Sequence, residues 1–260
     1  MRIRFLGTYS GESKDHKLVT FLIDDVIAVE AATLASELTF AEQRQIRAIL
    51  LSHCHYDHVR DLPAFAFNSA QNGSDSYAEV LSLPETLQAV ATHFFNGVIY
   101  PNYTDSDSYL GKPAIEFRPT ETYRSERIEG YRVVAVPVKH NIGAVGFEIT
   151  SEDGKNVFYS GDTGPGLSHL WERISPQLII ADTTFPNRLM KTASDAGHLC
   201  PDMLKRELQE FRRTKGYLPR VILVHLNPEY ASEIRIEAES LAKDLSISIA
   251  TVRDGETVVL

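Results

Sequence analysis

The feature that most constrains the fold is a run of metal-binding side chains directly behind a predicted strand. Residues 53–58 read HCHYDH and contain three of the nine histidines of the chain. The apolar residues 48–51 before them predict a buried β-strand, and in the extended stretch that follows, His53 and His55 project to the same side. A tight turn then brings the Asp and the last His of the motif beside them. Imidazole and carboxylate ligands together suit Zn²⁺, Mn²⁺ or Fe²⁺, so the motif predicts a transition-metal site at a strand end.

Three more candidate ligands each follow a predicted strand. The strands cover residues 133–138, 156–160 and 221–224, and the side chains after them are His140, Asp162 and His225. A single histidine at a strand end is more often an ordinary polar terminus than a ligand. Three such residues in a set order, each with matching neighbours, make coincidence a poor explanation. With the HxHxDH pattern, they resemble the metal ligands of the metallo-β-lactamase superfamily.

This resemblance implies a complete ligand set for two metal ions. The ligands divide into two groups that share one carboxylate: His53, His55 and His140 for one ion, Asp57, His58 and His225 for the other, and Asp162 bridging both. The ions are expected to be divalent transition metals, with Zn²⁺ or Mn²⁺ first and Fe²⁺ as a further candidate. Each ion keeps an open side, whereas a structural site usually closes its coordination sphere.

A further histidine, His198, completes neither group. It stands just ahead of a helix predicted to begin at Pro201, and taken alone it is as readily a helix-capping residue. The sequence segment AGHLCP around His198 and the segment ADTTF around Asp182 resemble those of the phosphodiesterase branch of the superfamily, which includes tRNase Z. In that branch a carboxylate at the Asp182 position orients a histidine at the His198 position beside the metals. The resemblance therefore implies a catalytic set of His198 as general acid, Asp182 and Asp57.

Other phrases narrow the resemblance to the class II cyclic-nucleotide phosphodiesterases. They include HFFNGVIYP at 93–101 and HLNPEY at 225–230, and the likeness extends over most of the chain. It implies hydrolysis of cAMP or cGMP to the 5′-monophosphate, with Asn96 and Tyr100 near the substrate. The chain departs from the class at residues 7–11, which are poorer in glycine, and at Tyr100, where the class often has Trp.

The implied reaction uses water that the metals activate. Two cations a few Å apart lower the pKa of a water between them from about 16 toward 7 and neutralise phosphate oxygens. The hydroxide attacks phosphorus in line, and the departing alkoxide needs a proton, which His198 can deliver.

Other functions stay open at this level. A tRNase Z-like nuclease uses a Gly/Pro-rich basic arm, and the sequence has none. The phrases around Asp182 and His198 count against a carboxylic ester or lactone hydrolase. A non-catalytic module would keep the fold with structural metal or none, and the open coordination positions argue against it. A phosphate loop at 161–166 is rejected, because the glycines lack the G-x-G-x-x-G register and more plausibly turn the backbone to aim Asp162 at the metals.

The order of predicted elements indicates a mixed α/β (α+β) fold. Residues 2–30 read as three consecutive strands, whereas the C-terminal third alternates strands with helices at 201–215 and 232–245. With the resemblance, this predicts a four-layered αββα sandwich. No repeat or linker divides the chain, so residues 1–260 are expected to form one domain, with an insertion at about 72–130.

Local signals also predict turns and helix ends. The pair Asp24-Asp25 predicts a turn between two strands. Thr39 with Glu42 three residues later predicts a capping box at the start of a short helix that runs through Gln45.

Composition limits the partners. A count of 26 Lys and Arg against 35 Asp and Glu gives a formal net charge of −9. Nucleic-acid binding needs a basic face, so no stable nucleic-acid partner is expected. The expected partner is a small anionic phosphodiester that the metals attract, and a homodimer stays open. No apolar run reaches the roughly 18 residues of a membrane span, the start reads as a strand rather than a secretory signal, and two cysteines cannot build a disulfide framework. We therefore expect a cytoplasmic protein without membrane contact.

Overall fold

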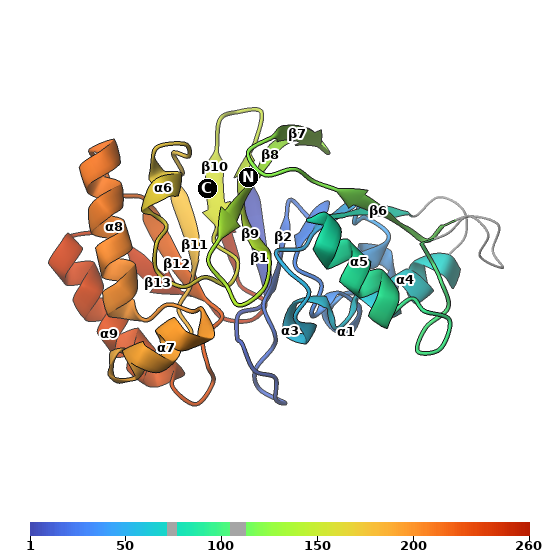
Figure 1. Ribbon diagram of the computed structural model, residues 1–260, viewed down its shortest axis with the longest axis horizontal. Helices are drawn as coiled ribbons and strands as arrows, with labels where there is room; N and C mark the ends of the chain where they lie inside the picture. The colour runs from blue at the N-terminus through green and yellow to red at the C-terminus, as the bar shows by residue number, and fades with distance from the viewer. Residues whose placement is uncertain (72–76, 105–112) are drawn as a thin grey trace.

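Two β-sheets pack face to face, with helices on both outer sides (Figure 1). The computed structural model describes residues 1–71, 77–104 and 113–260. The four layers follow the order helix, sheet, sheet, helix, which confirms the expected αββα sandwich.

The first sheet is built mainly from the N-terminal half of the chain. In spatial order, its described strands are β14 (Thr257–Val259), β1 (Arg2–Gly7), β2 (Thr20–Ile23), β3 (Ile27–Val29), β4 (Ala48–Leu50), β5 (Ala78–Ser82) and β6 (Ile115–Pro119). Neighbouring strands from β14 to β3 are antiparallel, and those from β3 to β6 are parallel.

The second sheet repeats this arrangement with later residues. In spatial order, its described strands are β7 (Ser125–Ile128), β8 (Tyr131–Val138), β9 (Ala144–Thr150), β10 (Asn156–Tyr159), β11 (Leu178–Asp182), β12 (Arg220–Val224) and β13 (Ile249–Thr251). The strands from β7 to β10 form an antiparallel meander, and those from β10 to β13 are parallel.

Helices cover the outer face of each sheet. On the first sheet lie α1 (Leu34–Glu37), α2 (Phe40–Gln43), α3 (Tyr56–Val59), α4 (Leu62–Gln71) and α5 (Pro84–His93). On the second lie α6 (Ser168–Trp171), the short 3₁₀ helix η1 (Asn187–Leu189), α7 (Met190–Ala196), α8 (Pro201–Lys215) and α9 (Ala231–Leu245). Across the described part of the chain, no helix has the length and apolar character needed to cross a bilayer.

The central strands are apolar on both faces because each sheet is covered on both sides. In β4, Ala48 and Leu50 pack into the layer between the sheets, whereas Ile49 packs under the helices of the first sheet. This is the alternation of side chains that a strand imposes. On the far side of the second sheet, Trp171 packs edge-on against Phe211 of α8, at 5.1 Å between ring centroids.

The segment 72–130, expected to be an insertion, contains strands of both sheets. β5 and β6 continue the parallel part of the first sheet, and β7 begins the second. Residues 72–76 and 105–112, which belong to the expected insertion, lie outside the described residues. The single-domain organisation and the insertion stay predictions.

The predicted turn and cap are confirmed. Asp24 and Asp25 both have positive φ, 47° and 57°, as a tight turn between β2 and β3 requires. The Thr39 hydroxyl accepts the backbone N–H of Glu42 at 3.3 Å, and the Glu42 carboxylate accepts the backbone N–H of Thr39 at 2.8 Å. This capping box starts α2, which ends at Gln43 rather than Gln45.

Candidate active site

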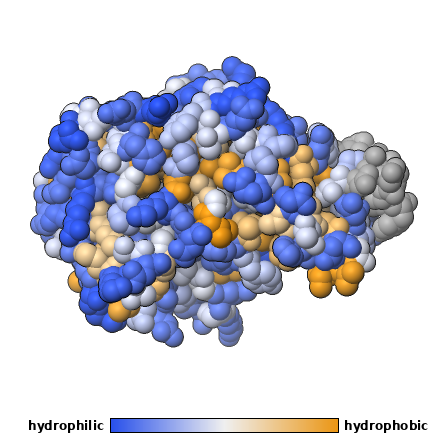
Figure 2. Space-filling view, viewed as in Figure 1, coloured by the Kyte–Doolittle hydropathy of each residue, from blue (hydrophilic) through white to orange (hydrophobic). Residues whose placement is uncertain are grey.

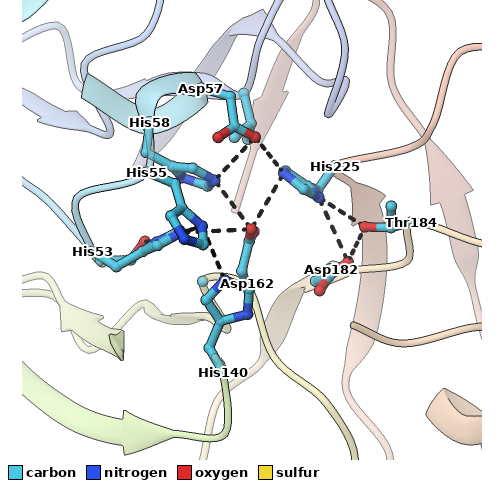
Figure 3. Close-up of polar contacts among 12 residues, drawn as sticks. His53, His55, Asp57, His58, His140, Asp162, Asp182, Thr184 and His225 are labelled. Atoms are coloured by element: carbon cyan, nitrogen blue, oxygen red, sulfur yellow. Dashed lines mark hydrogen bonds and ion pairs between the residues drawn. The ribbon is translucent and has the colours of Figure 1, made fainter. Parts of the chain in front are cut away.

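Side chains from loops of both sheets meet at one edge of the sandwich (Figure 3). The motif 53–58 follows β4 and leads into α3, whereas His140, Asp162 and His225 follow β8, β10 and β12 of the other sheet. Strands that run in the same direction end at the same edge, so the fold gathers residues far apart in sequence. Asp57 and His225, for example, are 168 residues apart, and the Asp57 carboxylate lies 3.2 Å from the His225 ring.

The candidate ligand atoms form two overlapping groups, in each of which all atoms lie within 4.8 Å of one another. The groups are His53, His55, His140 and Asp162, and Asp57, His58, Asp162 and His225. They match the two ligand groups that the resemblance implies, and Asp162 belongs to both.

In the first group, ring nitrogens converge. His55 Nδ1 lies 2.9 Å from His53 Nε2 and 3.1 Å from His140 Nε2. The outer nitrogens are engaged elsewhere, that of His53 by the Ser52 hydroxyl at 2.9 Å and that of His140 by the Gly197 carbonyl at 3.0 Å. Burial, and then the neighbouring charge of His58, lower the pKa of His53 well below its usual value. Neutral rings with converging lone pairs fit a divalent transition-metal ion.

In the second group, a buried carboxylate lies between two rings. Asp162 Oδ2 lies 3.2 Å from His58 Nε2 and 3.4 Å from His225 Nε2. Burial alone would raise the pKa of Asp162, but the two histidines outweigh it and hold the pKa well below its usual range.

Unpartnered polar atoms in this group also fit a metal ion. Asp162 Oδ1 is buried and makes no hydrogen bond, and the buried ring nitrogens of His58 lie 3.2 Å from Asp162 and 3.3 Å from Glu30 without hydrogen-bond geometry. Buried polar atoms are seldom left unpaired. Although burial opposes it, the carboxylates of Asp162 and Glu30 raise the pKa of His58 well above its usual value. The same negative field favours a divalent cation.

Beside these groups lies the pair His198 and Asp182. The Asp182 carboxylate accepts His198 Nδ1–H at 2.9 Å, the Thr163 backbone N–H at 3.0 Å and the Thr184 hydroxyl at 2.7 Å. Burial alone would lower the pKa of His198, but Asp182 outweighs it and raises the pKa to about 9. Without bound metal, Asp182 therefore favours the protonated His198 ring at neutral pH.

These two residues, with Asp162 and His225, form a third group of metal-binding residue types. The three hydrogen bonds received by Asp182 engage both of its oxygens. This engagement favours an orienting role for Asp182 over metal ligation.

Several partners of the histidines were not found from the sequence. Glu30 is fully buried at the end of β3, and its Oε1 lies 3.3 Å from His58 Nδ1. Thr184 contacts His225 Nδ1 at 2.7 Å. A charged residue that ends a buried strand is the signal that singled out Asp162, and it would also have singled out Glu30. Thr184 offers no such signal, because a lone Thr after a strand is unremarkable in sequence.

The backbone at the site takes unusual conformations. Gly161 has φ of +59°, and a Cβ there would lie 2.7 Å from the Val145 carbonyl oxygen, so only glycine fits before Asp162. This confirms that the glycine turns the backbone. His225 itself has φ of +59°, which costs a non-glycine residue about 1–2 kcal/mol. Strain of this size is characteristic of functional sites.

The two candidate substrate residues lie in the turn after α5. The Asn96 side chain accepts the backbone N–H groups of Val98 and Ile99 at 2.9 and 3.0 Å, so its carbonyl is engaged within its own turn. Tyr100 is half-buried against the core under α5. Val98 and Ile99 are 85% and 64% exposed, and Figure 2 shows an apolar patch at the lower right, where Figure 1 draws this loop. A substrate role for Asn96 and Tyr100 stays a prediction.

The model of the beta-lactamase superfamily domain matches residues 20–226. The chain therefore belongs to this superfamily, and its fold is the metallo-β-lactamase fold. Among solved structures, that of unliganded yeast PDE1 has a TM-score of 0.85 at 15% identity and covers 100% of this chain and 99% of that chain. The fold implies divalent metal ions, for which the two ligand groups are suited.

Named relatives support a hydrolase. A probable 3′,5′-cyclic-nucleotide phosphodiesterase of Yersinia pestis is 22% identical over 210 residues, which are 72% of this chain and 59% of that protein. A ribonuclease Z of Leuconostoc mesenteroides is 27% identical over 163 residues, which are 59% of this chain and 49% of that protein. In both cases the chain spans less than two thirds of the relative.

Proposed function

We propose that the chain is a dinuclear metal-dependent phosphodiesterase that hydrolyses 3′,5′-cyclic mononucleotides to 5′-monophosphates. The observation that carries the proposal is the His198–Asp182 pair, hydrogen-bonded at 2.9 Å beside the two ligand groups. A protonated histidine next to a metal centre suits a reaction whose leaving group needs a proton. The phosphodiesterase relative points to the same reaction class.

The metal roles follow the two ligand groups. His53, His55 and His140 would hold one ion, Asp57, His58 and His225 the other, and Asp162 would bridge them. Bound Zn²⁺ or Mn²⁺ would acidify water at neutral pH and neutralise phosphate oxygens. Because the chain carries a formal net charge of −9, the ions rather than a basic surface would attract a small anionic phosphodiester.

Residues of the chain donate the proton that the leaving group needs. Asp182 holds His198 by Nδ1, which leaves Nε2 for the substrate. From Nε2 the ring donates a proton to the ribose 3′ oxygen as the P–O bond breaks. The Thr163 backbone N–H fixes Asp182 in turn, so the acid is oriented before the substrate arrives.

An RNA 3′-processing nuclease of the ribonuclease Z kind is the second candidate, because a relative bears that name. The net charge of −9 disfavours it, since a long RNA requires many phosphate contacts from basic side chains.

A substrate panel separates these functions. The metal-loaded protein is assayed on cAMP, cGMP, a cyclic dinucleotide, bis(p-nitrophenyl) phosphate, a precursor tRNA and a lactone. We expect turnover of a cyclic mononucleotide with release of the 5′-monophosphate. If the protein cleaves bis(p-nitrophenyl) phosphate but no cyclic mononucleotide, the phosphodiesterase chemistry is kept and cyclic mononucleotides are rejected as substrates. Cleavage of the precursor tRNA alone would favour the nuclease, and turnover of the lactone alone would reject phosphodiester chemistry.

A further inference from the structure

Thr184 lies at the junction between the metal ligands and the acid. It follows β11, two residues after Asp182, and is 3% exposed. Its hydroxyl oxygen lies 2.7 Å from Asp182 Oδ1 and 2.7 Å from His225 Nδ1. Figure 3 draws both contacts as dashed lines. The oxygen is also 3.3 Å from His198 Nδ1. One buried hydroxyl therefore joins three residues of the site.

The number of available protons decides the direction of these bonds. A hydroxyl has one hydrogen to donate and can accept others. The Asp182 carboxylate can only accept, so the Thr184 hydrogen points to Asp182 Oδ1. Thr184 must then accept from His225, which places the His225 proton on Nδ1. The opposite direction would place that proton on Nε2, the nitrogen that faces Asp57 and Asp162 at 3.2 and 3.4 Å.

We propose that Thr184 is a positioning residue that locks His225 in the Nδ1–H tautomer and so presents the Nε2 lone pair to a metal ion. The inference rests on the proposed role of His225 as a ligand. Orientation of a ligating histidine through its outer N–H is a general device of metal sites, and loss of the partner typically costs about 10–100-fold in affinity.

The same contact ties the ligand to the acid. Asp182 accepts from His198 directly and from His225 through Thr184, so one buried carboxylate sets the orientation of both rings. Without the hydroxyl, an acceptor close to His225 Nδ1 is Asp182 Oδ1, at 3.8 Å. Rotation of the ring toward that oxygen would draw Nε2 away from the metal position.

The test compares three variants of two adjacent threonines. Thr184→Val removes the hydroxyl at constant shape, and Thr184→Ser restores it. Thr183→Val is the matched control, because Thr183 is also fully buried but its hydroxyl donates to the Asp182 backbone carbonyl at 2.7 Å. Zn²⁺ affinities are measured by competition with a chromophoric chelator, and thermal unfolding of each metal-free variant verifies that it is folded.

We expect Thr184→Val to weaken one of the two zinc sites about 10–100-fold, with the other changed less. Thr184→Ser and Thr183→Val should stay within about threefold of the wild type. Equal affinities in Thr184→Val and wild type would overturn the inference, and so would equal losses in the two valine variants. A wild type that binds no zinc would instead reject the proposed metal centre.

A second measurement needs no variant. Ring ¹⁵N shifts of His225 in the folded, zinc-loaded wild type report which nitrogen carries the proton; the loaded protein is used because without metal the Asp57 carboxylate, 3.2 Å from Nε2, is an acceptor for a proton on that nitrogen. We expect a protonated Nδ1 and an Nε2 without a proton. A protonated Nε2 in the neutral ring would overturn the inference even if Thr184→Val did not fold.

Discussion

Replacement of His198 by alanine tests the proton-transfer step. The ring donates to Asp182 at 2.9 Å, and its pKa is raised to about 9. The raised pKa favours the protonated ring at pH 7, although bound dications oppose its protonation. A positioned general acid contributes about 10²–10⁴ in rate, or about 3–5 kcal/mol of barrier.

The size of the loss should depend on the leaving group. A ribose 3′ alkoxide needs a proton to depart, whereas p-nitrophenolate hardly does. We expect His198→Ala to lose about 10²–10⁴ in kcat on a cyclic nucleotide and less than about tenfold on bis(p-nitrophenyl) phosphate. The control is His169→Ala, because His169 is exposed and its Nδ1 contacts the Gly166 carbonyl rather than the site.

The assay measures kcat on both substrates with metal content determined for every sample. Activity on the cyclic nucleotide should fall as the pH rises through the pKa of His198, because the neutral ring cannot donate the proton. This pKa is about 9 without metal and lower with bound dications, which oppose protonation of the ring. This alkaline limb should be absent in His198→Ala. Equal losses on the two substrates with metals retained would refute the acid role and favour charge stabilisation. Loss of an ion would identify His198 as a ligand.

Further predictions concern metal and stability. Asp162→Asn should lose both ions together, as measured by elemental analysis after gel filtration, and retention of one ion would contradict the bridging role. EDTA should lower the Tm of the metal-loaded protein, because ions that bind only the folded state stabilise it, and an unchanged Tm would argue against bound metal. Glu42→Ala should cost about 1 kcal/mol in urea unfolding through loss of its capping-box contact at the start of α2, with exposed Glu121→Ala as the control. Hydrogen bonds from Thr39 and Arg4 lower the pKa of Glu42 to about 2, so this contribution is present above pH 4.5 and is lost as the pH falls through about 2, as acid titration of wild type against Glu42→Ala would show.

The fold was predictable where local signals agreed. The bounds of α8 are those expected from the sequence, since Pro201 and Gly216 mark the ends of the helix. The helix α4 was missed although Asp61 and Pro63 are residue types that mark a helix start; in the structure the Asp61 carboxylate instead accepts the backbone N–H groups of Ala35 and Ser36 at 2.9 and 2.8 Å. The strand β6 (IEFRP) carries charges and a proline, and it becomes a strand only by pairing with β5 at the edge of the sheet.

The site was predictable to a similar depth. The motif 53–58 contains four candidate metal ligands within six residues, and the residues His140, Asp162 and His225, each after a predicted strand, are the remaining candidates. The residues that orient the histidine rings could not be predicted in this way, because a partner such as Thr184 contacts His225, which lies 41 residues further along the chain. Such partners depend on how β11 and β12 align, which the amino-acid pattern alone does not specify.

The division of the ligands between two sheets sets an order for maturation. A chain that has emerged only through β6 offers an ion the HCHYDH segment and nothing from His140 onward. The other half of each candidate ligand group comes into place only when the sheets dock, so we expect tight metal uptake to follow folding rather than direct it. Metal capture by a refolding chain would then report the docking of its two halves.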